Sequence, residues 1–151
     1  MPKFDWANAS ILITGGTGSF GQRFVSTMLE RYQPRRLAVL SRDEFKQYQM
    51  REKFGGGPGG SMRYFLGDVR DSERLRRAFQ GVDLVIHAAA LKQVPAAEAD
   101  PFEAVQTNII GSKNVIDAAI DAGVKRVLAL STDKAANPAN LYGATKQVAE
   151  K

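Results

Sequence analysis

Several side chains capable of chemistry lie close together near the C-terminal end of the sequence. They are Thr132, Asp133, Lys134, Tyr142 and Lys146. On a helix, residues four positions apart share one face, so the spacing Tyr-x-x-x-Lys places an ammonium group beside a phenol. A phenol with its ordinary pKa of about 10 is a poor base at neutral pH, and a neighbouring cation favours the phenolate. The alternative is that Tyr142 and Lys146 are an exposed helical pair without a catalytic role. The strands and helices that position the pair decide between these two interpretations.

The composition predicts one globular domain over residues 1–151. The chain has 44% hydrophobic and 25% charged residues, which is typical of soluble proteins. It has no cysteine and one histidine, so we expect no disulfide, thiolate or metal site. No apolar run approaches the roughly 20 residues that span a bilayer, so we expect a cytoplasmic protein without a membrane partner. The net charge of +5 is dispersed, which argues against a nucleic-acid partner.

Short apolar runs alternate with helical patterns along the whole chain. Strands are predicted at residues 10–14, 36–41, 62–66, 83–87 and 126–131. Helices are predicted from Phe20 to Met28, at 43–53, 72–79 and 101–122, and from Tyr142 onward. This order predicts an α/β, Rossmann-like parallel sheet of about five strands with helices on both faces.

A glycine-rich loop joins the first predicted strand to the first helix. Gly15, Gly18 and Gly21 have the spacing Gly-x-x-Gly-x-x-Gly at the position where a dinucleotide site needs it. Such a loop turns tightly, lets a pyrophosphate approach the backbone, and brings it to the N–H groups of a helix N-terminus. A glycine-rich turn without a ligand is the alternative. The cofactor-binding residues predicted here are Gly15, Thr17, Gly18, Ser19, Phe20 and Gly21.

The end of the second strand should distinguish NADP from NAD. An acidic residue there binds the 2′-hydroxyl of NAD, whereas a cation accommodates the 2′-phosphate of NADP. Arg42 and Lys46 favour NADP, while Asp43 keeps NAD possible. The alternative interpretation is that all three residues are surface or helix-capping charges.

The ends of the third and fourth strands supply further candidates. Asp68 is suited to accept a hydrogen bond from the adenine amino group, and Asn108 to order water or backbone near the site. We interpret His87, a lone histidine at a strand end, as structural. The additional cofactor-binding residues predicted are Asp68, Val69, Ala88, Ala89, Ala90, Lys92 and Asn108, together with Tyr142 and Lys146.

Together these motifs resemble the extended short-chain dehydrogenase/reductase superfamily. Within it, the chain closely resembles the inverting UDP-N-acetylglucosamine 4,6-dehydratases of bacterial nonulosonic-acid and capsule biosynthesis. The segments that carry this closer resemblance are Ser41–Glu44, His87–Pro95 and Ser131–Lys146.

The resemblance implies a role for each reactive side chain. Tyr142, with its pKa depressed by Lys146, would take the proton of the sugar C4 hydroxyl as hydride passes to the cofactor. Lys146 would also hold the nicotinamide ribose, and Thr132 would hydrogen-bond the C4 oxygen. Water would then leave across C5–C6, which requires an acid and a base. Asp133 fits as the acid and Lys134 as the base, with a loop ion pair as the alternative.

The resemblance also implies a longer protein. Relatives continue beyond Lys151 into a C-terminal domain that binds the nucleotide-sugar, so we expect that domain to be absent here, and full-length relatives to be homo-oligomers. A UDP-sugar is the implied substrate. An isolated NAD(P)-binding module without turnover and a nucleotide-sugar 4-epimerase or reductase remain the alternative functions.

Overall fold

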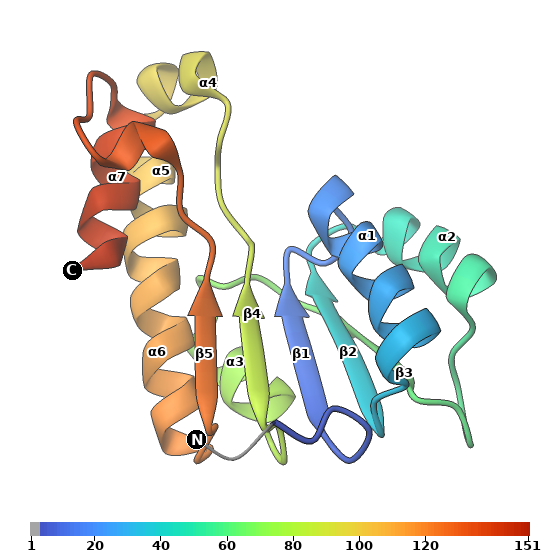
Figure 1. The fold of residues 1–151 in the computed structure, drawn as a ribbon. Helices are drawn as coiled ribbons and strands as arrows, with labels where there is room; N and C mark the ends of the chain where they lie inside the picture. Colours follow the sequence, from blue (N-terminus) through green and yellow to red (C-terminus); the bar gives the residue numbers. More distant parts are fainter. Residues whose placement is uncertain (1–3) are drawn as a thin grey trace.

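A single parallel sheet forms the centre of the protein. The structure, a computed structural model, describes residues 4–151. Its five strands lie in the order β3-β2-β1-β4-β5 (Figure 1). They are β1 (Ser10–Thr14), β2 (Arg36–Ser41), β3 (Met62–Leu66), β4 (Leu84–His87) and β5 (Arg126–Ala129). The predicted Rossmann-like class is confirmed.

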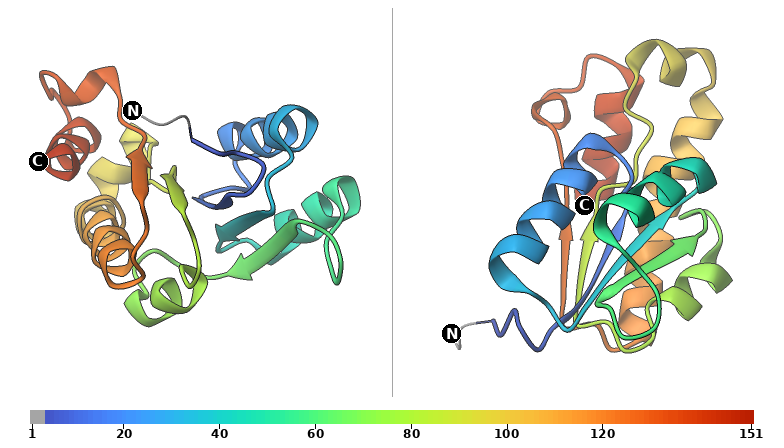
Figure 2. Two further views of the ribbon diagram at one scale, coloured as in Figure 1. Left: turned by 60° about the horizontal axis from the view of Figure 1, so that its bottom comes forward. Right: turned by 90° about the vertical axis from the view of Figure 1, so that its right-hand side faces the viewer.

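Helices cover the two faces of the sheet (Figure 2). On one face lie α1 (Ser19–Thr27), its π-helical continuation η1 (Met28–Tyr32), and α2 (Glu44–Phe54); on the other lie α3 (Ser72–Ala78) and α6 (Gly111–Asp121). Strand β1 serves both layers, because Leu12 packs into the core on the α3–α6 side and Ile11 and Ile13 into the core on the α1–α2 side. Burial on both faces explains why the strands read as continuous apolar runs.

The second half of the chain differs in detail from the prediction. The helix expected at 101–122 is composed of α5 (Pro101–Val105), the π-helical turn η2 (Gln106–Ile110) and α6. A short helix that the periodicity did not predict, α4 (Val94–Ala99), precedes it with a proline in its first turn. The last strand ends at Ala129 rather than at residue 131, and is followed by the 3₁₀ turn η3 (Asp133–Ala135) and by α7 (Leu141–Glu150).

Helices α4 and α7 stand above the carboxyl ends of β4 and β5 (Figure 1). Within residues 4–151, strand β5 is paired only with β4, and all four of its residues are exposed. Among residues 4–151, no helix has both the length and the apolar character needed to span a bilayer.

Candidate functional site

A cleft of about 290 Å³ lies at the carboxyl ends of the central strands. Open parallel sheets bind ligands at this end, where all strands have their carboxyl ends. We call it the carboxyl edge, and the opposite end the amino edge. The predicted residues that line it are Gly15, Thr17, Gly18, Arg42, Lys46, Asp68, Val69, Ala88, Ala89, Ala90 and Lys92. The remaining lining residues are Leu40, Ser41, Asp43, Gly67 and Thr107. Most of these adjoin predicted residues at strand ends, whereas Thr107 gave no signal in the sequence.

The glycine loop forms a cradle that has room for backbone only. Gly15 has φ +66°, and a Cβ placed on it would lie 2.8 Å from the backbone of Ala89. A Cβ on Gly21 would collide with the backbone of Gly16. No side chain caps the start of α1 after Gly18, which leaves the first N–H groups of the helix open to an anion. These features fit a dinucleotide pyrophosphate.

Three predicted residues of the loop occupy the first turn of α1 and do not line the cleft. They are Ser19, Phe20 and Gly21. The Phe20 ring is 46% exposed and stacks on Phe24 with a centroid distance of 6.1 Å, in an apolar groove over β4 and β5. Only the backbone of this turn is therefore placed to contribute to the cradle.

The cations at the end of β2 are paired with carboxylates. Arg42 lies 3.7 Å from Asp68, and Lys46 lies 3.7 Å from Asp43. Asp43 also caps α2, since it accepts a hydrogen bond from the Lys46 N–H at 2.9 Å. Burial acts to raise the pKa of Asp68, but hydrogen bonds and charge from Arg70, together with Arg42, lower that pKa overall. The cleft thus presents neutralised ion pairs rather than a bare cationic patch.

His87 is part of a saturated hydrogen-bond network, which confirms its structural interpretation. The ring is 4% exposed, with Nδ1 2.7 Å from Thr14 Oγ1 and Nε2 3.0 Å from Ser112 Oγ. Ser112 donates to the Asn108 carbonyl, so the network assigns the proton to Nε2 and leaves Nδ1 to accept from Thr14. Burial, and secondarily the charge of Lys146, lower the His87 pKa to about 4.

Asn108 joins the cofactor side of the sheet to α7. Its side chain exchanges two hydrogen bonds with the backbone of Leu91, at 2.8 and 2.9 Å, and donates to Thr145 Oγ1 at 3.0 Å. Thr145 in turn donates to the Tyr142 carbonyl at 2.8 Å. Asn108 does not line the cleft, and its hydrogen bonds order the backbone at Leu91.

The predicted acid and base lie on the exposed turn after β5. Lys134 Nζ is 3.5 Å from Asp133 Oδ1, and the Asp133 side chain is 88% exposed. Thr132 donates to Asp133 at 3.0 Å. This hydrogen bond, followed by the charge of Lys134, lowers the Asp133 pKa. The loop ion pair named as the alternative therefore exists in this structure.

Helix α7 packs against this turn at a point that requires glycine. A Cβ on Gly143 would collide with the carbonyl oxygen of Lys134. The neighbouring Tyr142 is half-buried, while Lys146 is 7% exposed and donates from Nζ to the Leu130 carbonyl at 2.6 Å. Burial lowers the Lys146 pKa, and Glu150 opposes this shift. Neither Tyr142 nor Lys146 lines the cleft.

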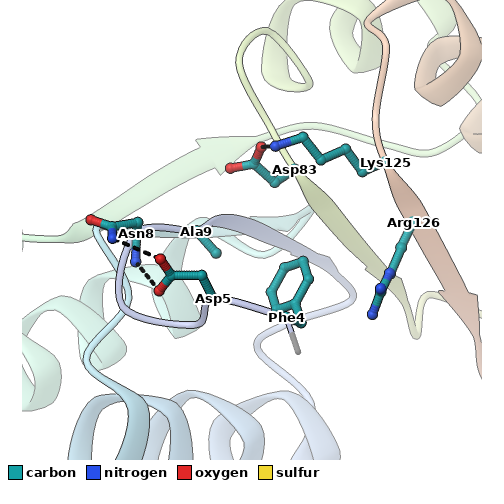
Figure 3. A pocket seen from close by; sticks show the side chains of 7 residues that line it. All are labelled: Phe4, Asp5, Asn8, Ala9, Asp83, Lys125 and Arg126. Carbon is teal, nitrogen blue, oxygen red and sulfur yellow. Dashed lines mark hydrogen bonds and ion pairs between the residues drawn. The ribbon is translucent and has the colours of Figure 1, made fainter. Parts of the chain in front are cut away.

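A larger cavity, of about 440 Å³, lies at the opposite, amino edge of the sheet (Figure 3). Asp83 at its wall lies 2.8 Å from Lys125, and Asp5 accepts a hydrogen bond from Asn8 at 2.8 Å. The Arg126 guanidinium lies 5.2 Å from the centre of the Phe4 ring. Because the glycine cradle and the uncapped start of α1 lie at the carboxyl edge, we assign the functional site there in spite of its smaller volume.

The fold and the glycine cradle define a Rossmann-like nucleotide-binding domain of the extended short-chain dehydrogenase/reductase type. The chain belongs to the polysaccharide biosynthesis protein family, which it matches over residues 11–151. It is 56% identical over 142 residues to the UDP-N-acetylglucosamine 4,6-dehydratase (inverting) of Campylobacter jejuni, across 94% of this chain and 42% of that protein. It is also 43% identical over 149 residues to a UDP-glucose 4-epimerase of Rickettsia massiliae, across 97% of this chain and 43% of that protein. The resemblance drawn from the sequence is confirmed.

Solved structures of other proteins share the fold, among them the following two. Pen from Bacillus thuringiensis superposes with a TM-score of 0.91 at 41% identity, across 97% of this chain and 44% of that chain. DesIV, a dTDP-glucose 4,6-dehydratase from Streptomyces venezuelae solved with NAD and TYD bound, superposes with a TM-score of 0.81 at 27% identity, across 93% of this chain and 49% of that chain. The chain spans less than half the length of each of these proteins.

Proposed function

We propose that the chain is the dinucleotide-binding part of an NADP-dependent UDP-N-acetylhexosamine 4,6-dehydratase that inverts C5. The observation that carries this proposal is the packing of α7 on the turn after β5 through Gly143. This packing puts Thr132, Asp133 and Lys134 beside the helix that bears Tyr142 and Lys146, at the carboxyl edge of the sheet. The identity to an inverting dehydratase supports the same reaction.

NADP is the cofactor proposed for the cleft. Bound NADP⁺ would accept hydride from C4 of the sugar and later return it to C6. The glycine cradle and the start of α1 would hold the pyrophosphate. Arg42 and Lys46 would meet the 2′-phosphate by exchanging their present partners, Asp68 and Asp43, for it. The NAD bound to DesIV shows that this fold also accepts the cofactor without that phosphate.

The first proton transfer is assigned to α7. Tyr142 as the phenolate would take the proton of the C4 hydroxyl, and Thr132 would donate a hydrogen bond to the C4 oxygen. Lys146 would stabilise the phenolate and bind the nicotinamide ribose. For this, its Nζ must leave or share the Leu130 carbonyl that it now contacts.

The elimination is assigned to the turn after β5. Lys134 would remove the C5 proton, which the C4 ketone acidifies, while Asp133 protonates the departing C6 hydroxyl as water. A proton delivered to C5 on the opposite face would invert that centre. Asp133 is exposed and its pKa is low in this structure, so the acid role requires the bound sugar to displace water from the carboxyl group.

Incubation of the chain with UDP-N-acetylglucosamine and NADP⁺ tests the proposal. A 4-keto-6-deoxy product, followed by mass spectrometry and NMR, supports it. Tyr142→Phe should abolish the product, and Lys134→Ala should abolish exchange of the C5 proton. Unchanged exchange in Lys134→Ala would refute the role of Lys134 as the base.

The same experiment distinguishes two further candidates. The epimerase relative in Rickettsia motivates a nucleotide-sugar 4-epimerase, for which the product would be the C4 epimer. The glycine cradle and the cleft beside it also fit an isolated NAD(P)-binding module, for which the chain would bind cofactor without turnover.

We also propose self-association for this protein, in the cytoplasm. Apolar side chains are exposed along α6, with Ile116 47% and Ile120 72% exposed, and nothing covers them within residues 4–151. A second copy of the chain would bury this surface. Light scattering after size-exclusion chromatography should give a mass above the 16.5 kDa monomer, and Ile116→Lys with Ile120→Lys should return it to the monomer.

A further inference from the structure

Most of the net charge of the protein lies at the amino edge. The segments at this edge, which is the lower end of the sheet in Figure 1, are 4–9, 30–36, 55–63, 76–83 and 121–126. They carry eight arginines and lysines but four acidic residues, which is +4 of the +5 of the whole chain. The other residues within 4–151 are neutral overall, with twelve of each kind. A charge that is dispersed along the sequence is therefore concentrated at one end of the fold.

Few of these cations have a carboxylate to pair with. The eight are Arg31, Arg35, Arg36, Arg63, Arg76, Arg77, Lys125 and Arg126, and seven of them are exposed. Asp83 lies 3.8 Å from Arg35 and 2.8 Å from Lys125, and Asp121 lies 3.0 Å from Arg76. Within residues 4–151, the other five form no ion pair, so their charge is available to a partner.

The local structure explains a part of this cluster. Cations in the last turn of a helix are stabilised by the helix dipole. This accounts for three of the eight, which are Arg31, Arg76 and Arg77. The others lie on strand starts and loops, where they repel one another: burial, and after it the charges of Arg63 and Arg35, lower the pKa of Arg36. A negatively charged partner would relieve this repulsion.

The cations form a flat array, because the parallel strands begin at nearly one level. The strand register places Arg36, Arg63 and Arg126 within two residues of one another along the strand direction, which is roughly 7 Å. A flat array fits an extended anionic surface. A second copy of the chain offers no such surface, since the residues outside the amino edge have no net charge.

Aromatic side chains flank the array. Phe4, Trp6 and Tyr32 form a row, with centroid distances of 4.7 Å and 5.1 Å between successive rings. The Arg126 guanidinium lies 5.2 Å from the centre of the Phe4 ring (Figure 3), and Tyr32 is 41% exposed. Tryptophan and tyrosine beside arginine and lysine are the side chains that favour the headgroup region of a bilayer.

We propose that the amino edge is a docking surface for an anionic lipid bilayer. The cations would contact lipid phosphates, and Trp6 and Tyr32 would lie at the level of the headgroups. The cofactor cleft lies at the opposite, carboxyl edge, so it would face the water. The expectation of no membrane partner rests on the lack of a spanning segment, which has no bearing on attachment to a bilayer surface.

Co-sedimentation with vesicles tests the proposal. The chain should bind phosphatidylglycerol vesicles and should not bind vesicles of phosphatidylcholine alone. Raising the salt from about 0.1 M to about 1 M shortens the Debye length from about 10 Å to about 3 Å and should release it. Trp6, the one tryptophan of the sequence, is a built-in probe of orientation. Brominated phosphatidylglycerol should quench its fluorescence on binding.

Charge reversal locates the surface. Arg31→Glu together with Arg77→Glu brings the amino edge to a net charge of zero and should weaken vesicle binding by about tenfold or more. The matched control is Arg23→Glu together with Lys113→Glu, at exposed positions towards the carboxyl edge, and should bind as the wild type does. Circular dichroism checks the fold of both. Arg31→Gln with Arg77→Gln serves if the glutamate variant does not fold.

Several results would overturn the inference. Equal binding to phosphatidylcholine and phosphatidylglycerol vesicles would show that the cations do not drive it. Equal weakening in the control variant, or binding without quenching of Trp6, would show that another face docks. Binding of duplex DNA without binding of phosphatidylglycerol vesicles would assign the surface to nucleic acid instead.

Discussion

The two edges of the sheet both carry a polar cavity, but they differ in how many of their polar groups already have partners. At the amino edge, Asp83 accepts from the Ser10 N–H at 2.8 Å and lies within 2.8 Å of Lys125 and 3.8 Å of Arg35. At the carboxyl edge, the first turn of α1 has no side-chain cap, so its N–H groups are open to a ligand. Within residues 4–151, each edge also has one buried hydroxyl without a partner, Ser10 Oγ at the amino edge and Thr107 Oγ1 at the carboxyl edge. The amino edge is the larger cavity and the carboxyl edge is the one prepared for a ligand.

The comparison teaches that open backbone N–H groups at a cleft identify a site better than volume does, whereas a buried hydroxyl without a partner occurs at both edges. A saturated cavity offers a ligand only the exchange of one hydrogen bond for another. An unsatisfied group offers a net gain when the ligand arrives. Mutations at the carboxyl edge should therefore change cofactor binding, whereas mutations in the cavity at the amino edge should change stability and leave cofactor binding unchanged.

The largest effect is expected from Gly21→Ala. The added Cβ would collide with the backbone of Gly16, which cannot move without opening the turn. We expect a loss of about 3 kcal/mol in the free energy of unfolding and loss of dinucleotide binding, measured by urea denaturation and calorimetry. Gly60→Ala is the control, because the nearest atom to its Cβ is 3.8 Å away. Unchanged binding in Gly21→Ala would show that the cradle does not need this close approach.

Acid should destabilise the fold through His87. Burial lowers its pKa from 6.5 to about 4, so the unfolded chain takes up the proton at a higher pH than the folded chain. The contribution of neutral His87 to the free energy of unfolding is complete above pH 6.5. It is lost as the pH falls towards 4, by about 3 kcal/mol in total. Protonation of the folded chain near pH 4 would also turn Nδ1 from an acceptor into a donor facing Thr14, so the cradle should weaken at that pH.

Denaturation at a series of pH values measures this effect. His87→Gln should flatten the dependence between pH 6.5 and 4, since this is the one histidine of the sequence. If the stability of His87→Gln fell between pH 6.5 and 4 as steeply as that of the wild type, the assignment of this loss to His87 would be wrong. The contribution of Asp83 to the free energy of unfolding is lost at a lower pH, because Lys125 and the Ser10 N–H hold the pKa of Asp83 below its ordinary value of 3.8.

Arg42→Ala should change cofactor choice rather than stability. Its side chain is 57% exposed, so its ion pair with Asp68 contributes little to the fold. We expect NADP⁺ to bind about tenfold more weakly and NAD⁺ to bind as before. Arg35→Ala removes the same charge at the amino edge and should leave both dissociation constants unchanged. A wild-type preference for NAD⁺ would refute the NADP assignment.

The smallest effect is expected from Asp83→Asn. The side chain is 21% exposed, and the amide still accepts the Ser10 N–H while losing its charge interactions. We expect a loss of about 1 kcal/mol in the free energy of unfolding with unchanged NADP⁺ affinity. Reduced affinity in this variant would break the distinction between the two edges.

Much of the cofactor half of the site could be predicted from the sequence because its residues follow strands directly. The Gly15–Gly21 loop, Arg42, Asp68 and Ala88–Ala90 each lie at the end of an apolar run, and parallel strands bring their carboxyl ends to one edge. The pairing of Arg42 with Asp68 could not be predicted, since it depends on side chains from neighbouring strands.

The second half of the chain was harder to predict. A π-helical turn keeps a nearly helical pattern of apolar residues, so η2 and its unpaired Thr107 have no signature in the sequence. Helix α4 is short and rich in alanine, and its pattern is too brief to show a period. The roles of Asp133, Lys134, Tyr142 and Lys146 stay predictions.

The sequence by itself determined the sheet, the glycine cradle and the family, because continuous apolar runs and glycine spacing are local patterns with few structural solutions. The tertiary structure alone decided which polar groups are satisfied. It paired Asp83 at the amino edge and joined His87 to Thr14 and Ser112 inside the fold. Within residues 4–151 it left one buried hydroxyl without a partner at each edge, on Ser10 and on Thr107. Hydrogen-bond satisfaction depends on atoms brought together from distant segments, and for that reason no local pattern encodes it.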